Sequence, residues 1–178
     1  PVDVYEQVMV PVLRKLGETW RNGEHVVTAQ IHLTTEVLRS VAQDLHRLSN
    51  PSHSPRVALV ACMADELHVL PLYAIAFKLE QHQFRSVILG ARTHASVIEI
   101  VKSRLRPTLV ALSLTVIPER QRALELLDEY AAACGDVPWL VGGLGAQELS
   151  TDIAERGGQL IVDLHDLDSA MQQLNPTP

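Results

Sequence analysis

The chain has 178 residues, of which 47% are hydrophobic but only 4% aromatic, and its formal net charge is -6 at pH 7. This length suits one α/β domain with a small helical addition, and an interior of Val, Leu, Ile and Ala is typical of a parallel sheet covered by helices. The acidic balance argues against a nucleic-acid surface within the chain, and no stretch approaches the ~20 apolar residues that span a bilayer.

Before residue 50 the apolar residues are spaced by threes and fours, which predicts helices. We expect two or three of them, separated by the Asn22-Gly23 pair, with the last and longest running from about Val26 to Leu48. Residues 49–55 contain two prolines with Ser and Asn. Such a segment cannot continue a helix, so we predict a linker there.

After the linker, short apolar runs alternate with helical patterns, and such runs suit strands that are buried on both faces of a sheet. The predicted strands are 56–62, 87–89, 109–113, 138–141 and 159–162, and the predicted helices are 67–81, 96–104, 119–133, 146–156 and 167–174. This alternation predicts an α/β fold, a five-stranded doubly wound parallel (Rossmann or flavodoxin-like) sheet preceded by a small helical cap. The expected domains are the cap, a partial four-helix bundle over residues 1–50, and the sheet domain over residues 51–178.

Polar and small residues follow four of the predicted strands. Right-handed crossovers place all strand-to-helix turns at one edge of the sheet, where open α/β folds bind ligands. The residues are Asp65, Glu66 and His68 after the first strand, Gly90 and His94 after the second, Ser113 and Thr115 after the third, and Gly142 and Gly143 after the fourth. Turns also collect such residues for backbone reasons, so this series indicates either one binding site or ordinary turn chemistry.

The order of these residues resembles that of cobalamin-binding domains. That family shows Asp-x-His-x-x-Gly after the first strand, a Leu-Gly pair after the second, Ser with a nearby Thr after the third, and Gly-Gly after the fourth. The chain has Glu66-x-His68, Leu89-Gly90, Ser113-Leu114-Thr115 and Gly142-Gly143 in the same order. It departs from the pattern in the first turn, where Glu66 replaces the aspartate and Pro71 replaces the glycine.

The resemblance implies cobalamin as the cofactor, with His68 as the metal ligand on the lower side of the cobalt. A neutral imidazole suits such a metal, and a carboxylate two residues earlier can accept the other ring N–H and so fix the tautomer. The cofactor's dimethylbenzimidazole tail would occupy a slot beside the sheet. The resemblance places Ser113, Thr115, Gly142 and Gly143 along this slot, and Glu66, Val69 and Gly90 belong to the same cofactor-binding set.

Upstream, Leu16-Gly17-Glu18-Thr19-Trp20-Arg21-Asn22-Gly23 resembles the cap helices of corrinoid methyltransferase proteins and of light-sensing MerR-class regulators. By this resemblance Trp20, Val27 and Gln30 would face the upper side of the cofactor, although packing between helices explains Trp20 equally well. The Glu-His pair of the photoreceptors falls on Gln30-Ile31, so their light-switching mechanism does not carry over directly. His25 and His32 are candidate upper ligands, but helix histidines are more commonly surface residues.

These features favour a cobalamin-binding sensory domain of a light- or cofactor-responsive transcriptional regulator. We expect a cytoplasmic, homo-oligomeric protein without enzymatic activity, which contacts no membrane and binds DNA only through a domain absent from this chain. The alternatives are a corrinoid carrier of a methyltransferase system, a haem-type tetrapyrrole sensor of the same fold, and an inactive descendant that mediates only protein contacts.

Other chemistry has little support in the sequence. Ser113 lacks the Gly-x-Ser-x-Gly elbow of hydrolases, and Gly142-Gly143-Leu144-Gly145 has no following Lys-Ser/Thr for a phosphate loop. Cys62 and Cys134 lie far apart without metal-ligand spacing, so we expect two reduced thiols.

Overall fold

The computed structural model describes residues 1–21, 27–51 and 53–174, and the side chains of residues 19–21, 27, 28 and 174 also lie outside the described part. Within the described ranges the chain divides into two units, Pro1–Ser49 and Asn50–Pro178. None of the helices in these ranges is long and apolar enough to cross a membrane.

The first unit is helical. A short α1 (Val2–Val4), a π-helical turn η1 (Tyr5–Met9) and α2 (Val10–Arg21) follow one another without a break, and α3 (Val27–Ser49) is the long helix expected before the linker. The buried side chains of this unit are Val2, Tyr5, Met9, Leu38 and Ala42. They come from both helical segments, so a hydrophobic seam joins the two segments.

The second unit contains a parallel five-stranded sheet. Its strands are β1 (Val57–Cys62), β2 (Arg85–Gly90), β3 (Leu109–Ser113), β4 (Trp139–Gly142) and β5 (Gln159–Ile161), in the spatial order β2-β1-β3-β4-β5. This is the flavodoxin-like order, whose direction of winding reverses between β1 and β3. The predicted five-stranded doubly wound sheet is confirmed.

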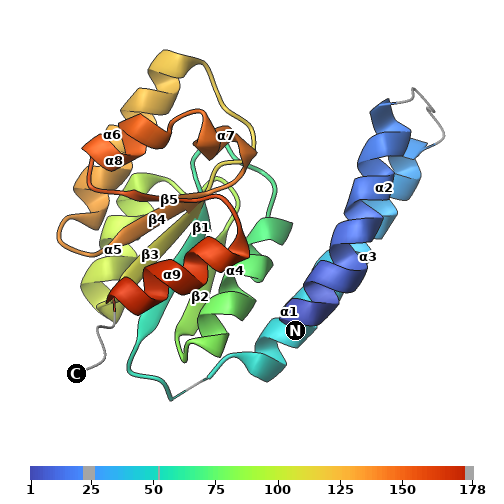
Figure 1. Cartoon of the computed structure of the whole chain (residues 1–178), viewed down its shortest axis with the longest axis horizontal. Coiled ribbons are helices and arrows are strands. Elements are labelled where there is room, and N and C mark those ends of the chain that lie inside the picture. The colour runs from blue at the N-terminus through green and yellow to red at the C-terminus, as the bar shows by residue number, and fades with distance from the viewer. Residues whose placement is uncertain (22–26, 52, 175–178) are drawn as a thin grey trace. The chain divides into compact units, whose positions relative to one another are not determined.

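Helices cover both faces of this sheet, as Figure 1 shows. The helices are α4 (Leu70–Gln81), α5 (Ala95–Leu105), α6 (Arg120–Cys134), α7 (Leu144–Gln147), α8 (Ser150–Glu155) and α9 (Leu164–Leu174). The helices α4 and α9 lie over one face, where Leu72, Leu79 and Leu167 pack on alternate residues of β1 and β3. The other face carries α5, α6 and α8 over a second core.

Three of the predicted helices differ from the structure by more than one residue at an end or by division into two helices. The helix α4 begins at Leu70 and not at residue 67, because the preceding residues form a hydrogen-bonded turn. The segment 146–156 forms the two short helices α7 and α8. The helix α9 starts three residues early, because Asp163 Oδ1 accepts hydrogen bonds from the backbone of His165 (2.7 Å) and Asp166 (2.9 Å) and so acts as an N-cap.

Candidate functional site

The carboxyl ends of β1 and β3 lie next to each other at the point where the winding of the sheet reverses. Cys62 pairs with Ser113 in the sheet register, and the next amide, of Met63, donates to the Ser113 carbonyl at 3.1 Å. The turns that follow the two strands are therefore neighbours. Open α/β sheets bind their ligands above such a reversal point.

A buried carboxylate links these two turns. Glu66 is 1% exposed, and its Oε1 accepts the His68 backbone N–H at 2.7 Å and lies 2.5 Å from His68 Nδ1. Its Oε2 accepts hydrogen bonds from the amides of Thr115 and Val116, the latter at 3.1 Å. Burial alone would raise the pKa of Glu66, but the hydrogen bonds from both turns outweigh it and hold the pKa below its usual range. Glu66 is therefore an ionised acceptor at neutral pH.

This contact fixes the imidazole of His68. Because a carboxylate only accepts hydrogen bonds, Nδ1 carries the proton that faces Glu66, and in the neutral ring Nε2 then keeps a free lone pair. The side chain is 57% exposed, and the His68 carbonyl accepts a weak hydrogen bond from Cys62 Sγ at 3.5 Å. The arrangement is that of a metal-ligating histidine whose second nitrogen is held by a carboxylate.

The turn after β2 reaches the same edge. The Arg92 amide donates to the Glu66 carbonyl at 3.0 Å, and the Thr93 amide donates to the Cys62 carbonyl at 3.1 Å. Gly90 ends β2 with φ +96°, a conformation that glycine adopts without strain. Val69 is half-buried directly before α4. Glu66, His68, Val69 and Gly90 are therefore brought together, as the sequence predicts.

The turn after β4 packs backbone against backbone on the turn after β3. Gly143 has φ +112°, and a Cβ on it would lie 2.4 Å from the Leu114 carbonyl oxygen. A Cβ on Gly142 would lie 3.3 Å from the Ile161 carbonyl oxygen. Gly143 is thus required by the fold itself, in addition to any role toward a ligand.

Two buried hydroxyls at this edge have no hydrogen-bond partner among the described residues. They are Ser113 Oγ and Thr115 Oγ1. A buried polar group without a hydrogen-bond partner lowers the free energy of unfolding by about 1–3 kcal/mol. A ligand that supplies the missing partner would explain why both hydroxyls are present. Along β3, Ser113 shares the α4 and α9 face with Ala111, because side chains alternate between the faces of a strand.

A small cavity lies between this face and the helices α4 and α9. Its volume is about 10 Å³, and its lining residues are Ile75, Ala111, Leu112, Leu140, Gly142, Ile161 and Leu167. The cavity, the missing side chain of Gly142 and the unpaired Ser113 hydroxyl are neighbours in the sheet. The apolar lining of this cavity, with the unpaired Ser113 hydroxyl next to Gly142 in the sheet, matches the chemistry of a largely apolar group that carries polar atoms, although about 10 Å³ holds no such group.

Sequence reasoning missed a set of exposed hydrophobic side chains at this edge. Leu67, Val116, Leu144 and Val162 are 54–72% exposed, and each comes from the segment that follows a different strand. Their signal in the sequence was a large apolar residue inside an otherwise polar turn. Exposed apolar side chains from four such segments suit contact with a flat, mostly apolar ring system.

The remaining predicted residues belong to the first unit. Gln30 and His32 are exposed on α3. The side chains of Trp20 and Val27 lie outside the described residues, as does His25. Within the described ranges, no three His, Cys, Asp or Glu side chains gather as metal ligands. A single presented imidazole suits a metal that arrives already chelated by a macrocycle.

The fold and its presented imidazole define a ligand-binding domain of the open α/β class. The sequence model of the B12 binding domain family matches residues 56–170. The chain belongs to this family, and its cofactor is cobalamin.

Two curated relatives from Myxococcus xanthus are similar to most of the chain. It is 28% identical over 151 residues to the HTH-type transcriptional repressor CarA and 29% identical over 149 residues to the HTH-type transcriptional repressor CarH. These alignments cover 85% and 83% of the chain but only 50% and 49% of the relatives. The chain therefore spans about half the length of the curated relatives that it matches.

Solved structures share the fold. A novel cobalamin-binding protein from Desulfitobacterium hafniense DCB-2 matches 91% of this chain and 77% of its own with a TM-score of 0.55 and 18% identity. The methanol:cobalamin methyltransferase complex MtaBC from Methanosarcina barkeri matches 96% of this chain and 67% of its own with a TM-score of 0.55 and 14% identity. At these identities the similarity concerns the fold alone.

Proposed function

We propose that the chain is the cobalamin-binding sensory half of a transcriptional regulator and that His68 is the lower axial ligand of the cobalt. The single observation that carries this proposal is the buried Glu66 carboxylate, which orients the ring of His68 and leaves Nε2 available. A carboxylate behind a ligating imidazole also increases its basicity toward the metal. When bound, the cofactor supplies a cobalt centre whose upper ligand can be lost or exchanged.

The residues of the chain have distinct roles in this proposal. His68 binds the metal, and Glu66 holds the ring proton at Nδ1. Ser113 and Thr115 donate or accept hydrogen bonds at the end of the slot for the nucleotide tail, and Gly142 leaves room for it. Leu67 and its apolar neighbours in the other turns exclude water from the lower face of the corrin.

We propose the helical first unit as the cap of the cofactor, with Gln30 among its contacts; the other predicted contacts, Trp20 and Val27, have side chains outside the described residues. A change of upper ligand would then shift the position of the cap and through it the association of copies of the chain. Because the relatives are HTH-type repressors of about twice the aligned length, we place DNA binding in a separate part of the regulator, acting in the cytoplasm. No catalytic step is needed for this role.

The proposal is tested by adding adenosyl-, methyl- and hydroxocobalamin to the purified chain in the dark and recording absorption spectra before and after illumination. We expect a bound corrinoid spectrum for the wild type and a weakened or altered one for His68→Ala. His53→Ala, which removes an exposed histidine in the linker before β1, is the matched control and should behave like the wild type. A haem-type Soret band, or absence of any bound corrinoid, would overturn the proposal.

The ligand assignment has its own test. In the cobalt(II) form, the nitrogen below the metal splits the electron paramagnetic resonance lines. Protein carrying ¹⁵N-labelled histidine should convert the triplets of ¹⁴N ligation into doublets if His68 is the ligand. Persistent triplets would assign the lower position to the cofactor's own base. Demethylation of bound methylcobalamin by a methyltransferase partner would favour a corrinoid carrier over a sensor.

A further inference from the structure

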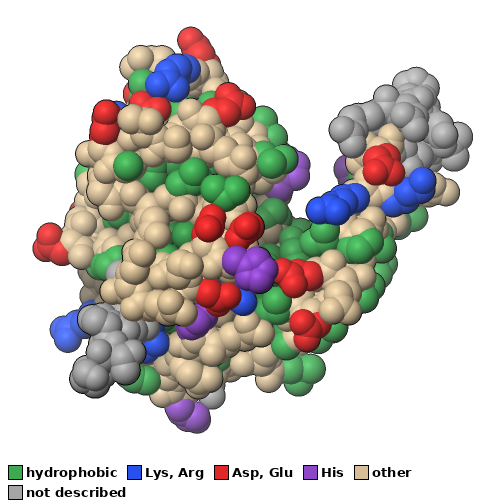
Figure 2. Space-filling view, viewed as in Figure 1, with side chains coloured by type: hydrophobic (Ala, Val, Ile, Leu, Met, Phe, Trp, Pro, Cys, Tyr) green, Lys and Arg blue, Asp and Glu red, His purple; other side chains and the backbone are tan. Residues whose placement is uncertain are grey.

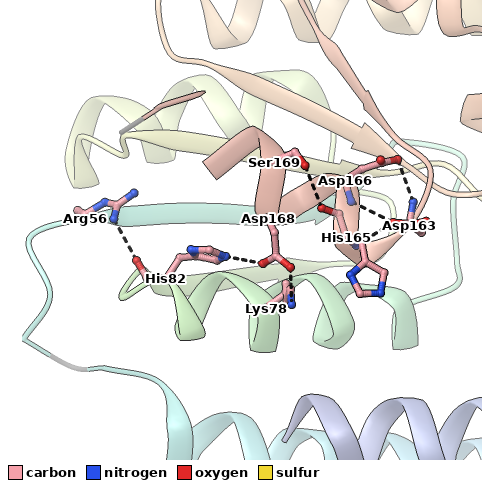
Figure 3. A network of polar contacts seen from close by, with 8 residues as sticks. All are labelled: Arg56, Lys78, His82, Asp163, His165, Asp166, Asp168 and Ser169. Atoms are coloured by element: carbon pink, nitrogen blue, oxygen red, sulfur yellow. Dashed lines mark hydrogen bonds and ion pairs between the residues drawn. The ribbon is translucent and has the colours of Figure 1, made fainter. Parts of the chain in front are cut away.

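Three side chains join α4 to α9, and we call them the α4–α9 latch. Lys78 Nζ lies 2.8 Å from Asp168 Oδ2, and His82 Nε2 lies 2.7 Å from Asp168 Oδ1. Figure 3 shows Lys78 on α4 and His82, directly after the end of α4, both directed at Asp168 on α9. The Lys78 side chain is only 14% exposed, so this contact is screened less than an ion pair on the open surface.

The latch residues adjoin the two helical walls of the cavity. Ile75, one turn before Lys78 on α4, lines the cavity, and so does Leu167, which directly precedes Asp168 on α9. With the latch formed the cavity measures about 10 Å³, which is about the space of one water molecule. Sites for small organic ligands measure about 300–1,000 Å³. A nucleotide tail therefore fits only after α9 and α4 move apart.

The start of α9 is held separately from the latch. Asp163 caps the helix, and Asp166 Oδ2 accepts the Val162 amide at 2.9 Å, which ties the first turn to the end of β5. Figure 3 shows this group of contacts at one end of α9 and the latch further along the helix. Acidic side chains and a histidine also gather over the start of α9 on the face shown in Figure 2.

We propose that the α4–α9 latch controls the insertion of the cofactor's nucleotide tail beside the sheet. This inference rests on the proposed function, because it concerns the same cofactor. The tail-accepting state is a minor, opened state, and the apparent dissociation constant equals the intrinsic one divided by the open fraction. Weakening the latch raises the open fraction and accelerates binding of a corrinoid that carries a tail. A corrinoid without a tail needs no opening.

The test compares cobalamin with cobinamide, a corrinoid that lacks the nucleotide tail. Asp168→Asn removes the charge of the latch at nearly constant side-chain size. Asp128→Asn is the matched control, because it removes the charge of another ion pair, which joins α6 to the residue after α8 (Asp128 Oδ1 to Arg156 Nε, 2.6 Å) on the opposite face of the sheet. Association rates are measured by stopped-flow absorption, and hydrogen exchange of the α9 amides is measured without any corrinoid.

We expect Asp168→Asn to accelerate cobalamin association about three- to tenfold and to leave cobinamide within about twofold of the wild-type rate. The α9 amides should exchange faster in this variant and at the wild-type rate in Asp128→Asn. Equal acceleration of both corrinoids, or an unchanged cobalamin rate, overturns the latch while leaving cobalamin binding in place. Binding of neither corrinoid overturns the latch together with the proposed function.

A second variant tests the latch independently, in case Asp168→Asn does not fold. Lys78→Met keeps the His82–Asp168 contact and the aliphatic part of the Lys78 side chain while removing its charge. This variant should also accelerate the association of cobalamin selectively, by a smaller factor than Asp168→Asn. A selective slowing would contradict the latch.

Discussion

Glu66 contacts His68 at two points through the same oxygen, Oε1, which accepts the His68 backbone N–H at 2.7 Å and lies 2.5 Å from ring Nδ1. Its second oxygen accepts the amides of Thr115 and Val116. One buried carboxylate thus orients the candidate cobalt ligand and also joins the turns after β1 and β3.

The first prediction concerns Glu66→Gln. The amide keeps one acceptor oxygen and turns an NH₂ group toward backbone N–H donors, so buried hydrogen bonds to a charged acceptor are lost. We expect the free energy of unfolding to fall by about 2–4 kcal/mol, measured by urea denaturation. Glu99→Gln on the exposed side of α5 is the matched control and should change stability by less than about 0.5 kcal/mol. Equal losses in both variants would refute the special role of Glu66.

The second prediction concerns Gly143→Ala. The new Cβ would lie 2.4 Å from the Leu114 carbonyl oxygen at φ +112°, so the two turns must separate. We expect a loss of about 2–4 kcal/mol in the free energy of unfolding. Gly90→Ala is the control, because Gly90 has φ +96° but open space at the Cβ position, and it should cost only about 1–2 kcal/mol. A larger loss at Gly90 than at Gly143 would contradict the close approach of the turns.

The sequence predicts the central strands β1, β3 and β4 well because each is a short apolar run that is buried along its whole length. The run over residues 57–62, for example, is completely buried. Helix starts are harder to predict, because they depend on local hydrogen bonds. The carboxylates of Asp163 and Asp166 accept backbone N–H groups directly after β5, and these hydrogen bonds set the start of α9. Apolar spacing alone does not contain these contacts and starts the helix later, at residue 167.

The candidate site is only partly predictable for a different reason. The first-turn pair of Glu66 and His68 is two residues apart, so their contact follows from local sequence. The contacts of Glu66 with Thr115 and Val116 depend on the register of β1 against β3, which no local pattern contains. The same holds for Lys78 and Asp168, which lie on separate helices ninety residues apart.

The third prediction concerns alkaline pH and Cys134. Burial raises the pKa of its thiol to about 12, although the nearby positive charge of Lys102 acts in the opposite direction. In the unfolded chain a thiol ionises near pH ~8.5. Above that pH the unfolded state has lost a proton that the folded state keeps, so stability falls as pH rises, by about 1.4 kcal/mol per unit up to the folded pKa.

Urea denaturation of the wild type and of Cys134→Ala at several pH values from about 8 to 11 measures this effect. The variant should lose less stability per pH unit than the wild type, by the contribution of one thiol. Burial also raises the pKa of Tyr130, and this residue is common to both proteins, so it does not affect the difference. Parallel stability curves would show that the thiol ionises equally in both states.

The last prediction separates a structural from a ligand-binding role for Ser113. Its buried hydroxyl has no partner among the described residues, so Ser113→Ala removes an unsatisfied group. We expect the free energy of unfolding without cofactor to stay constant or to rise by about 1 kcal/mol. Cobalamin should nevertheless bind more weakly, by about five- to tenfold, because the variant has no hydroxyl to form a hydrogen bond with the nucleotide tail at the end of the slot.

Ser86→Ala is the control with the opposite expectation. Ser86 is also a buried serine on a strand, but its Oγ donates to the Ala76 carbonyl at 3.4 Å, so its loss leaves that carbonyl without the bond. This variant should lose about 0.5–1.5 kcal/mol of stability and keep the wild-type affinity for cobalamin. Thermal unfolding and equilibrium titration of both variants provide the two readouts. Destabilisation by Ser113→Ala with unchanged cobalamin affinity would mean that the hydroxyl serves the fold and not the cofactor.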